Sequence, residues 1–277
     1  MIRTRSTLVF ALTLVLTLTA CGWLESQEDR TKDWSVTKLY SEASESFAAG
    51  NYKQAIEYYE KLEARYPFGR YATQSQLDVA YAYYRAGEPE SALAAADRFI
   101  KLYPKNPYVA YVYYLKGIVN YNRGVGFLDR YIPTDPSQRD LGSAVDAFQD
   151  FAELVRLFPE SKYAPDARQR MIFLRDNLAK SEVHIARYYM KRQAYVAAAN
   201  RCKYVLEHYQ RTSAVKDALE ILIEAYRHLG KHRLAADTER VLALNRRQAG
   251  RLLDDEPAHG AVSPWRRIWN YVGLDTN

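Results

Sequence analysis

Apolar and polar residues are arranged along this chain in blocks that share one design. The block Ala55–Pro67, AIEYYEKLEARYP, starts with alanine and ends in Tyr-Pro, and Ala92–Pro104, ALAAADRFIKLYP, has the same frame. Ala147–Pro159 repeats the frame with Phe-Pro, Ala198–Gln210 keeps only the tyrosine, and Ala235–Arg247 is a weaker fifth copy. Positions 0, 4, 7 and 11 of this repeat frame, counted from the first alanine, lie on one face of a helix.

Each copy is predicted to be the second helix of a hairpin. An apolar stripe ended by glycine precedes each of the two best copies: Val36, Leu39, Tyr40, Ala43 and Phe47 before Gly50, and Leu77, Ala80, Tyr81 and Tyr84 before Gly87. The alanine lets a neighbouring helix approach closely, and the closing proline cannot continue the helix. The repeating unit is therefore helix, glycine turn, helix, proline turn.

This unit resembles the tetratricopeptide repeat, with its alanine, its bulky residue four positions later and its closing proline. One hairpin cannot bury its own apolar face, so neighbouring hairpins must stack. We expect an all-α, tetratricopeptide-like superhelical solenoid of about five helical hairpins. Stacked helical hairpins without a functional groove are the alternative.

Two interruptions divide the array. The first is an insertion at residues 122–143 within the N-terminal repeats 1–3, which span residues 34–159. It is rich in Gly, Pro and Asp, and it also holds Phe127, Leu128 and Ile132, which indicates a segment that packs or binds. A loop folded on its own repeat is an equally open alternative. The second lies in residues 160–248, where apolar residues between Pro165 and Arg192 predict one long helix before repeats 4 and 5.

The N-terminus has the layout of a signal peptide. Arg3 and Arg5 precede an apolar run, Leu8–Leu18, that is shorter than the about 20 residues of a membrane-spanning helix, so residues 1–20 are expected to be cleaved. The sequence LTAC resembles the lipobox of bacterial lipoproteins. That resemblance implies a covalent diacylglycerol and an N-acyl chain on Cys21, a lipidated linker at 21–33 and, because Gly22 follows, anchoring at the periplasmic face of the outer membrane. An ordinary cleavage site with an incidental cysteine is the alternative.

Composition fits a folded helical protein without disulfides. Hydrophobic residues make up 48% of the chain, which holds 24 tyrosines and only two cysteines. The formal net charge is +6, and removal of Arg3 and Arg5 leaves +4, which favours acidic partners only weakly. With Cys21 lipidated, Cys202 is the only thiol left, and its place in the repeat frame predicts a core residue.

No catalytic or metal-binding motif is found. The chain lacks a P-loop, a nucleotide-binding glycine fingerprint and an HExxH motif. His228 and His232 have metal-like spacing, but Gly230 between them is expected to separate two helices. We therefore expect neither an enzyme, nor a metal site, nor a cofactor other than the lipid on Cys21.

Several segments together resemble the BamD (ComL-type) family of outer-membrane lipoproteins. They are RYPFGRYATQSQLDVAYAYYRAG (Arg65–Gly87), YVAYVYYLKG (Tyr108–Gly117), QRD (Gln138–Asp140), YAPDAR (Tyr163–Arg168) and YYMKRQAYVAAANR (Tyr188–Arg201). The match also includes the lipobox, the five repeats and the insertion, and it extends to about residue 248. As a set these motifs are specific.

The resemblance implies a non-enzymatic subunit of the β-barrel assembly machinery. Its implied partners are a BamA-like barrel protein, other Bam lipoproteins, unfolded outer-membrane proteins and, through the lipid, the outer membrane. It implies a partner-binding side at Arg192, Tyr195 and Arg201. It also implies a substrate-receiving groove with these members: Tyr66, Phe68, Arg70, Tyr81, Tyr84 and Tyr111.

Two other functions are kept open. One is a peptidoglycan-associated or DNA-uptake (competence) lipoprotein, and the other is a periplasmic enzyme built on helical repeats. Nucleic-acid binding is unfavoured, because the basic residues are interleaved with acidic ones and make no clear stripe.

The C-terminal part, residues 249–277, departs from the repeat frame. An acidic linker, DDEPAHG, leads to PWRRIWNYVG (Pro264–Gly273), in which Trp265, Ile268, Trp269 and Val272 would share a helical face. Interfacial membrane binding, docking on a partner and folding onto repeat five are all compatible with this pattern.

Overall fold

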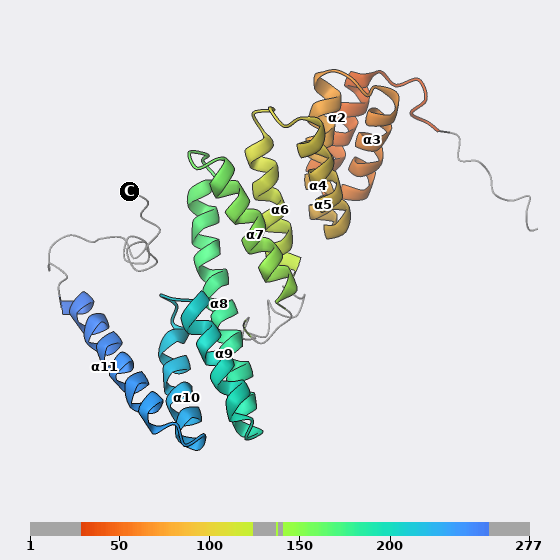
Figure 1. Cartoon of the computed structure of the whole chain (residues 1–277). Helices are drawn as coiled ribbons and strands as arrows, with labels where there is room; N and C mark the ends of the chain where they lie inside the picture. The colour runs from red at the N-terminus through yellow and green to blue at the C-terminus, as the bar shows by residue number, and fades with distance from the viewer. Residues whose placement is uncertain (1–28, 124–136, 138–140, 255–277) are drawn as a thin grey trace, which may run out of the picture.

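The computed structural model describes residues 29–123, 137 and 141–254, which form ten α-helices and no strand (Figure 1). The predicted signal peptide 1–20, Cys21, the tail 255–277 and most of the insertion 122–143 lie outside the described residues. The helices are α2 (Val36–Ala48), α3 (Tyr52–Arg65), α4 (Arg70–Ala86), α5 (Pro89–Leu102), α6 (Val109–Arg123), α7 (Gly142–Leu157), α8 (Ala164–Lys191), α9 (Tyr195–His208), α10 (Ala214–His228) and α11 (His232–Asp254).

These helices form an extended array of hairpins. Each packs against the helix before it and the helix after it in the chain, and α10 also packs against α8. Figure 1 shows α2 and α3 at one end of the array and α11 at the other. The all-α solenoid expected from the repeats is confirmed.

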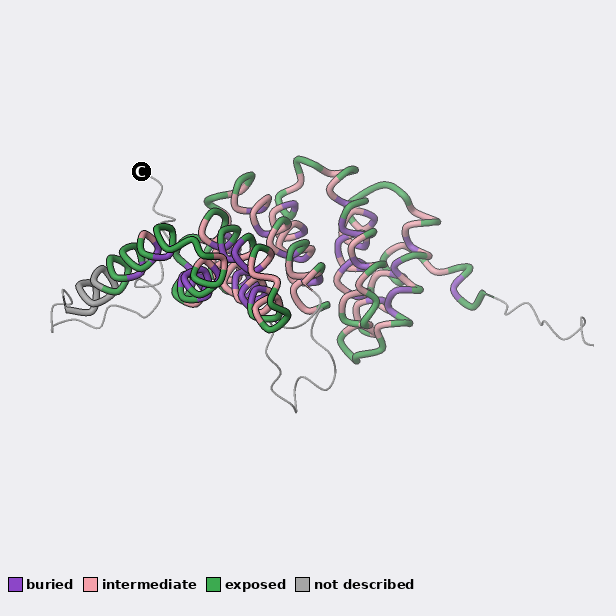
Figure 2. Tube along the Cα trace, turned by 60° about the horizontal axis from the view of Figure 1, so that its bottom comes forward, coloured by how far each residue is buried: buried purple, intermediate pink, exposed green. Residues whose placement is uncertain are grey.

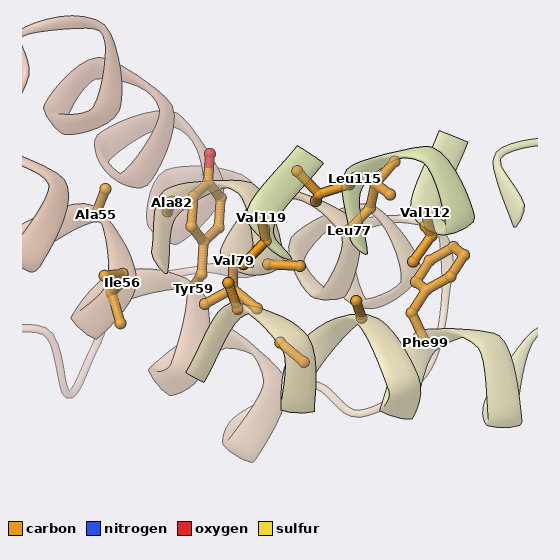
Figure 3. Packing of buried hydrophobic residues seen from close by; sticks show 14 of the residues in the cluster. Ala55, Ile56, Tyr59, Leu77, Val79, Ala82, Phe99, Val112, Leu115 and Val119 are labelled. Atoms are coloured by element: carbon orange, nitrogen blue, oxygen red, sulfur yellow. The ribbon is translucent and has the colours of Figure 1, made fainter. Parts of the chain in front are cut away.

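The repeat frame coincides with the buried face of the second helices. Its five alanines are at most 3% exposed. The residues seven positions later are also buried: Leu62, Phe99, Leu154 and Val205 are at most 1% exposed, and Leu242 is 8% exposed. The residue four positions on is also buried in the first four copies, including Tyr59 and Cys202. Figure 3 shows Ala55, Tyr59 and Phe99 among the apolar side chains of the N-terminal core.

The aromatic residue at frame position 11 ends each of the first four second helices. Tyr66, Tyr103, Phe158 and Tyr209 follow α3, α5, α7 and α9, and the N–H of each donates to the carbonyl four residues earlier at 2.8–2.9 Å. In three copies a proline then follows and prevents another helical turn. The fifth copy has neither residue, and α11 continues to Asp254.

In four of the five hairpins the turn has a left-handed residue five positions before the frame alanine. Glycine supplies it in repeats one, two and five, at Gly50, Gly87 and Gly230, with φ of 68–81°. In repeat four the same position is Gln193, with φ of 59°. A side chain with a β-carbon is strained in this conformation, whereas glycine is not.

Helix α8 is the single long helix that the spacing between Pro165 and Arg192 predicts, with 28 residues. It packs against α7 on one side and against α9 and α10 on the other, so it joins the front and rear repeats. Ser137, from the insertion, is buried and lies 3.0 Å from His184 of α8. One residue of the insertion therefore contacts this connecting helix.

The left-handed turn residues predict that two substitutions change the free energy of unfolding in opposite directions. Gln193→Gly is expected to raise the free energy of unfolding by about 1 kcal/mol, and Gly87→Ala to lower it by a similar amount, because only the left-handed strain changes. A β-carbon at Gly87 would meet no atom within 4 Å, so no steric clash is added there. Urea unfolding followed by circular dichroism measures both changes.

The matched control is Gln149→Gly, at an exposed position inside α7. Glycine costs about 1 kcal/mol in a helix interior, so this variant should be less stable. If Gln193→Gly were destabilised like Gln149→Gly, the strain at residue 193 would be disproved.

Candidate binding surfaces

The first helices of the front repeats carry two groups of packed aromatic side chains, which together we call the aromatic strip. Its members come from α2, α4, α6 and the residue before α8: Phe47, Tyr81, Tyr84, Tyr111, Tyr114 and Tyr163. Ring centroids are 5.5 Å apart for Phe47 and Tyr81, and 6.0 Å apart for Tyr81 and Tyr84. Tyr163 lies 5.6 Å from Tyr111 and 5.0 Å from Tyr114. The stacking of repeats thus joins residues that are far apart in the chain.

A pocket opens at the α2–α4 end of the aromatic strip. It measures about 210 Å³, and its lining residues are Ser44, Phe47, Tyr59, Asp78 and Tyr81. Small-molecule and cofactor sites usually measure about 300–1,000 Å³, so this pocket suits one side chain of a peptide better than a cofactor. Three of its five walls are aromatic rings, which favours an apolar or aromatic side chain.

Asp78 gives the pocket a fixed polar group. The Tyr40 hydroxyl donates to one carboxylate oxygen and the Gln74 amide to the other, both at 2.9 Å. Burial raises the pKa of Asp78, and burial together with the nearby carboxylate raises the pKa of Tyr40. Burial also raises the pKa of Tyr59 to about 12. Each Asp78 oxygen keeps a further lone pair that can accept a hydrogen bond from a ligand.

Tyr81, Tyr84 and Tyr111, expected in the groove, all belong to the aromatic strip. Tyr81 lines the pocket, and the hydroxyl of Tyr84 accepts a hydrogen bond from Asn122 at 2.7 Å. Burial raises the pKa of Tyr111. The guanidinium of Arg85 lies 5.9 Å from the ring of Tyr81, which adds a positive charge at the pocket rim.

Tyr66, Phe68 and Arg70 lie instead at the turn between α3 and α4, and none of them lines the pocket. The Tyr66 hydroxyl donates to the carbonyl of Trp34 at 3.0 Å, whereas Phe68 is 90% exposed. Arg70 stacks on Tyr71 at 4.8 Å, and Tyr71 packs 5.2 Å from Tyr40, the donor to Asp78. The turn therefore reaches the pocket only through intervening rings.

A second surface surrounds the turn between α8 and α9. Arg192 follows α8, is exposed and lies 6.0 Å from the ring of Tyr188. Tyr188 is 56% exposed and Val196 60%. Tyr195 begins α9 and stacks on His228 at 4.3 Å with nearly parallel rings. Exposed apolar side chains beside an exposed arginine are typical of protein-binding surfaces.

Arg201 differs from Arg192, because it already has an intramolecular partner. Its guanidinium pairs with Glu182 of α8 at 3.1 Å, and the Glu182 side chain is only 18% exposed. The pair joins α8 to α9. A partner protein that binds Arg201 must share it with Glu182 or displace that carboxylate.

Sequence reasoning missed Asp78 and the other pocket residues from α2, Ser44 and Phe47. A signal was present, because Gln74, Asp78, Tyr81 and Arg85 are spaced to share one face of α4. Asp78 is also the only acidic residue of that helix. The pocket itself needs the register of α2 against α4, which the pattern of one helix does not contain.

The described residues offer no cluster that could hold a metal ion, and their one cysteine is buried. His228 ends α10 and His232 begins α11, so they lie on different helices as predicted. No group of three or more His, Cys, Asp or Glu residues within the described ranges can hold a metal ion. Cys202 is fully buried, and burial raises its pKa to about 12, so it is a core residue rather than a reactive thiol.

No helix within the described ranges is long and apolar enough to span a bilayer.

Residues 32–242 match the family model YfiO, described as outer membrane lipoprotein. A protein of Neisseria meningitidis serogroup B named outer membrane protein assembly factor BamD is 46% identical over 266 residues, covering 95% of this chain and 99% of that protein. Proteins of the same name are 36% identical in Xylella fastidiosa (86% and 81% covered) and 35% identical in Vibrio cholerae (83% and 96%). A crystal structure of MamA is a weak likeness, with a TM-score of 0.36 and 14% identity over 76% of this chain and 96% of that one.

The two arginines of the rear surface should behave differently when replaced. Arg201→Ala leaves the largely buried Glu182 unpaired and is expected to lower the free energy of unfolding by about 0.5–1 kcal/mol, since Arg201 is itself partly exposed. Arg192→Ala should leave it unchanged within about 0.5 kcal/mol, because Arg192 is exposed and its contact with the exposed ring of Tyr188 is long, at 6.0 Å. Urea unfolding measures both, and equal losses would contradict the assignment.

Proposed function

The chain belongs to the outer membrane lipoprotein family YfiO, and from this membership we propose that it is a subunit of the outer-membrane β-barrel assembly machinery. In this proposal it is a non-enzymatic scaffold, anchored through lipid on Cys21 at the periplasmic face of the outer membrane. The front repeats receive unfolded outer-membrane proteins, and the rear repeats bind a BamA-like barrel protein. The relatives' name, outer membrane protein assembly factor, supports the role.

The contacts of residues 29–34 support a short tether. Asp29 pairs with Lys61 at 3.0 Å and with Arg65, and Thr31 is buried against the same helix, α3. Seven residues lie between Cys21 and Asp29, and the eight steps from one Cα to the next span at most about 28 Å in an extended chain. A lipid on Cys21 would therefore hold repeat one close to the membrane surface.

The pocket in the aromatic strip is the observation that carries the substrate role. An unfolded barrel protein presents extended segments with aromatic side chains, and one such ring fits a pocket walled by Phe47, Tyr59 and Tyr81. Arg85 at the rim can meet a carboxylate of the same peptide. Because binding uses one side chain at a time, the site can accept many sequences.

The exposed patch of Tyr188, Arg192 and Val196 carries the partner role. It stands on the α8–α9 turn, away from the aromatic strip of the first helices. Arginine suits bidentate pairing with a carboxylate at a protein interface. Arg192 is thus our leading candidate for an ion pair with a BamA-like protein. Arg201 already pairs with Glu182, so it would contribute only if its guanidinium bound Glu182 and the partner together.

Substrate binding is tested with a fluorescent peptide that ends in phenylalanine. Tyr81→Ala is expected to weaken binding about fivefold, since an aromatic contact contributes about 1 kcal/mol. Fluorescence anisotropy with the unlipidated chain measures the dissociation constant. Tyr188→Ala, which removes an exposed tyrosine of the rear surface, is the matched control. Equal loss in both variants, or none in Tyr81→Ala, would refute the assigned pocket.

Partner binding is tested by purifying the lipidated protein in mild detergent. We expect a BamA-like barrel protein to be recovered with it, and Arg192→Glu to reduce that recovery while Lys101→Glu, a charge reversal at an exposed site of α5, leaves it intact. Recovery of peptidoglycan fragments alone would point to a cell-wall role. Loss of recovery in both variants would show a general charge effect.

A further inference from the structure

The last helix of the array has an apolar stripe that no other described residue covers. Leu234, Val241 and Leu244 of α11 are 45%, 46% and 62% exposed. The opposite edge of the same helix, with Ala235 and Leu242, is buried against α10. Figure 2 shows α11 at the end of the array with mostly exposed residues along its length. We call Leu234, Val241 and Leu244 the α11 stripe.

The repeat frame shows that the α11 stripe is unusual. Its members stand one residue before the frame alanine and six and nine residues after it. These three positions hold Gln54, Lys61 and Ala64 in the first copy. They hold Ser91, Arg98 and Lys101 in the second copy, and Asp146, Glu153 and Arg156 in the third. Each of these residues is partly or fully exposed, so the frame assigns the position to solvent. Only in the fifth copy are the residues at all three positions large and apolar.

A solenoid needs its terminal repeat covered by an element with a polar outer face. The chain carries such an element just beyond α11, in Pro264–Gly273. Trp265, Ile268, Trp269 and Val272 fall on one helical face, and Arg266, Arg267 and Asn270 fall outside it. No other segment after the repeats combines an apolar face with polar residues in this way.

The lengths are compatible with docking on α11. The nine residues between Asp254 and Pro264 span up to about 30 Å when extended. Val241 lies 13 residues before the end of α11, which is about 20 Å of helix. A ten-residue helix measures about 15 Å, the same as the axial distance from Leu234 to Leu244. The segment can therefore turn back and lie antiparallel along the stripe.

We propose that Pro264–Gly273 folds back as an amphipathic helix, covers the α11 stripe and caps the C-terminal end of the solenoid. Its two tryptophans pack on Val241 and Leu244, and its arginines face solvent. The occupant of the apolar face is thus this chain's own tail, not a bilayer, a second copy or a partner protein. This proposal is independent of the substrate and partner roles proposed above.

Tryptophan fluorescence tests it directly. The chain has four tryptophans, so Trp23→Phe and Trp34→Phe leave only Trp265 and Trp269 as reporters. The chain from residue 21 onward is used, with Cys21→Ser to prevent lipidation. We expect blue-shifted emission and protection from acrylamide quenching, and we expect Val241→Asp with Leu244→Asp to abolish both. Ala243→Asp, exposed on the opposite side of α11, is the matched control and should change neither.

Each alternative occupant gives a distinct result. Emission and quenching equal to those of the urea-unfolded chain would overturn the proposal, as would protection that survives the two stripe substitutions. Protection that depends on protein concentration would assign the face to a second copy. Protection that appears only with vesicles of phosphatidylethanolamine and phosphatidylglycerol would assign the tail to the membrane. Circular dichroism checks that the variants keep their helix content.

Discussion

The array depends on small residues where its helices cross. The five frame alanines are almost completely buried, so the surrounding helices pack closely around each of them. Gly117 does the same at the contact of α6 with α7, since a β-carbon there would lie 2.4 Å from the ring of Phe151. Large aromatic side chains fit between the helices only because these positions are small. Spacing between repeats, and with it the position of every surface residue, follows from this constraint.

A solenoid of this kind has two ends that the repeats themselves do not cover. At the N-terminal end, Trp34 packs 5.4 Å from Tyr58, and Asp29 and Thr31 bind Arg65 of the same helix. Hydrogen bonds from Thr31 and Lys61 hold the pKa of Asp29 well below its usual range, so the carboxylate stays charged. Residues 29–34 therefore have a structural role in repeat one, in addition to the proposed role as a tether. The apolar surface of α11 poses the same problem at the other end.

Most of the fold could be predicted, because the repeat frame records both burial and helix ends. Alanine and the bulky residue seven positions later identified the buried face, and Tyr-Pro or Phe-Pro identified where the second helices stop. Gln193 was not recognised as a left-handed turn residue, because its type gives no sign of it and only its offset from Ala198 does. The fifth copy lacks both the aromatic residue that ends the other four second helices and the proline that follows it in the first three, so α11 continues beyond the end of the repeat frame.

The candidate sites were less predictable, since each depends on contacts between helices. Tyr81 and Tyr84 were named through the family resemblance, whereas the position of Asp78 in the pocket depends on its contact with Tyr40 of α2. Phe68 was named through the same resemblance, and it is 90% exposed at the turn between α3 and α4. The first helices contribute one surface together, across repeats, while each turn stands at its edge. A scaffold that binds different partners needs this division, since residues of one surface can then change without disturbing the packing that holds the other.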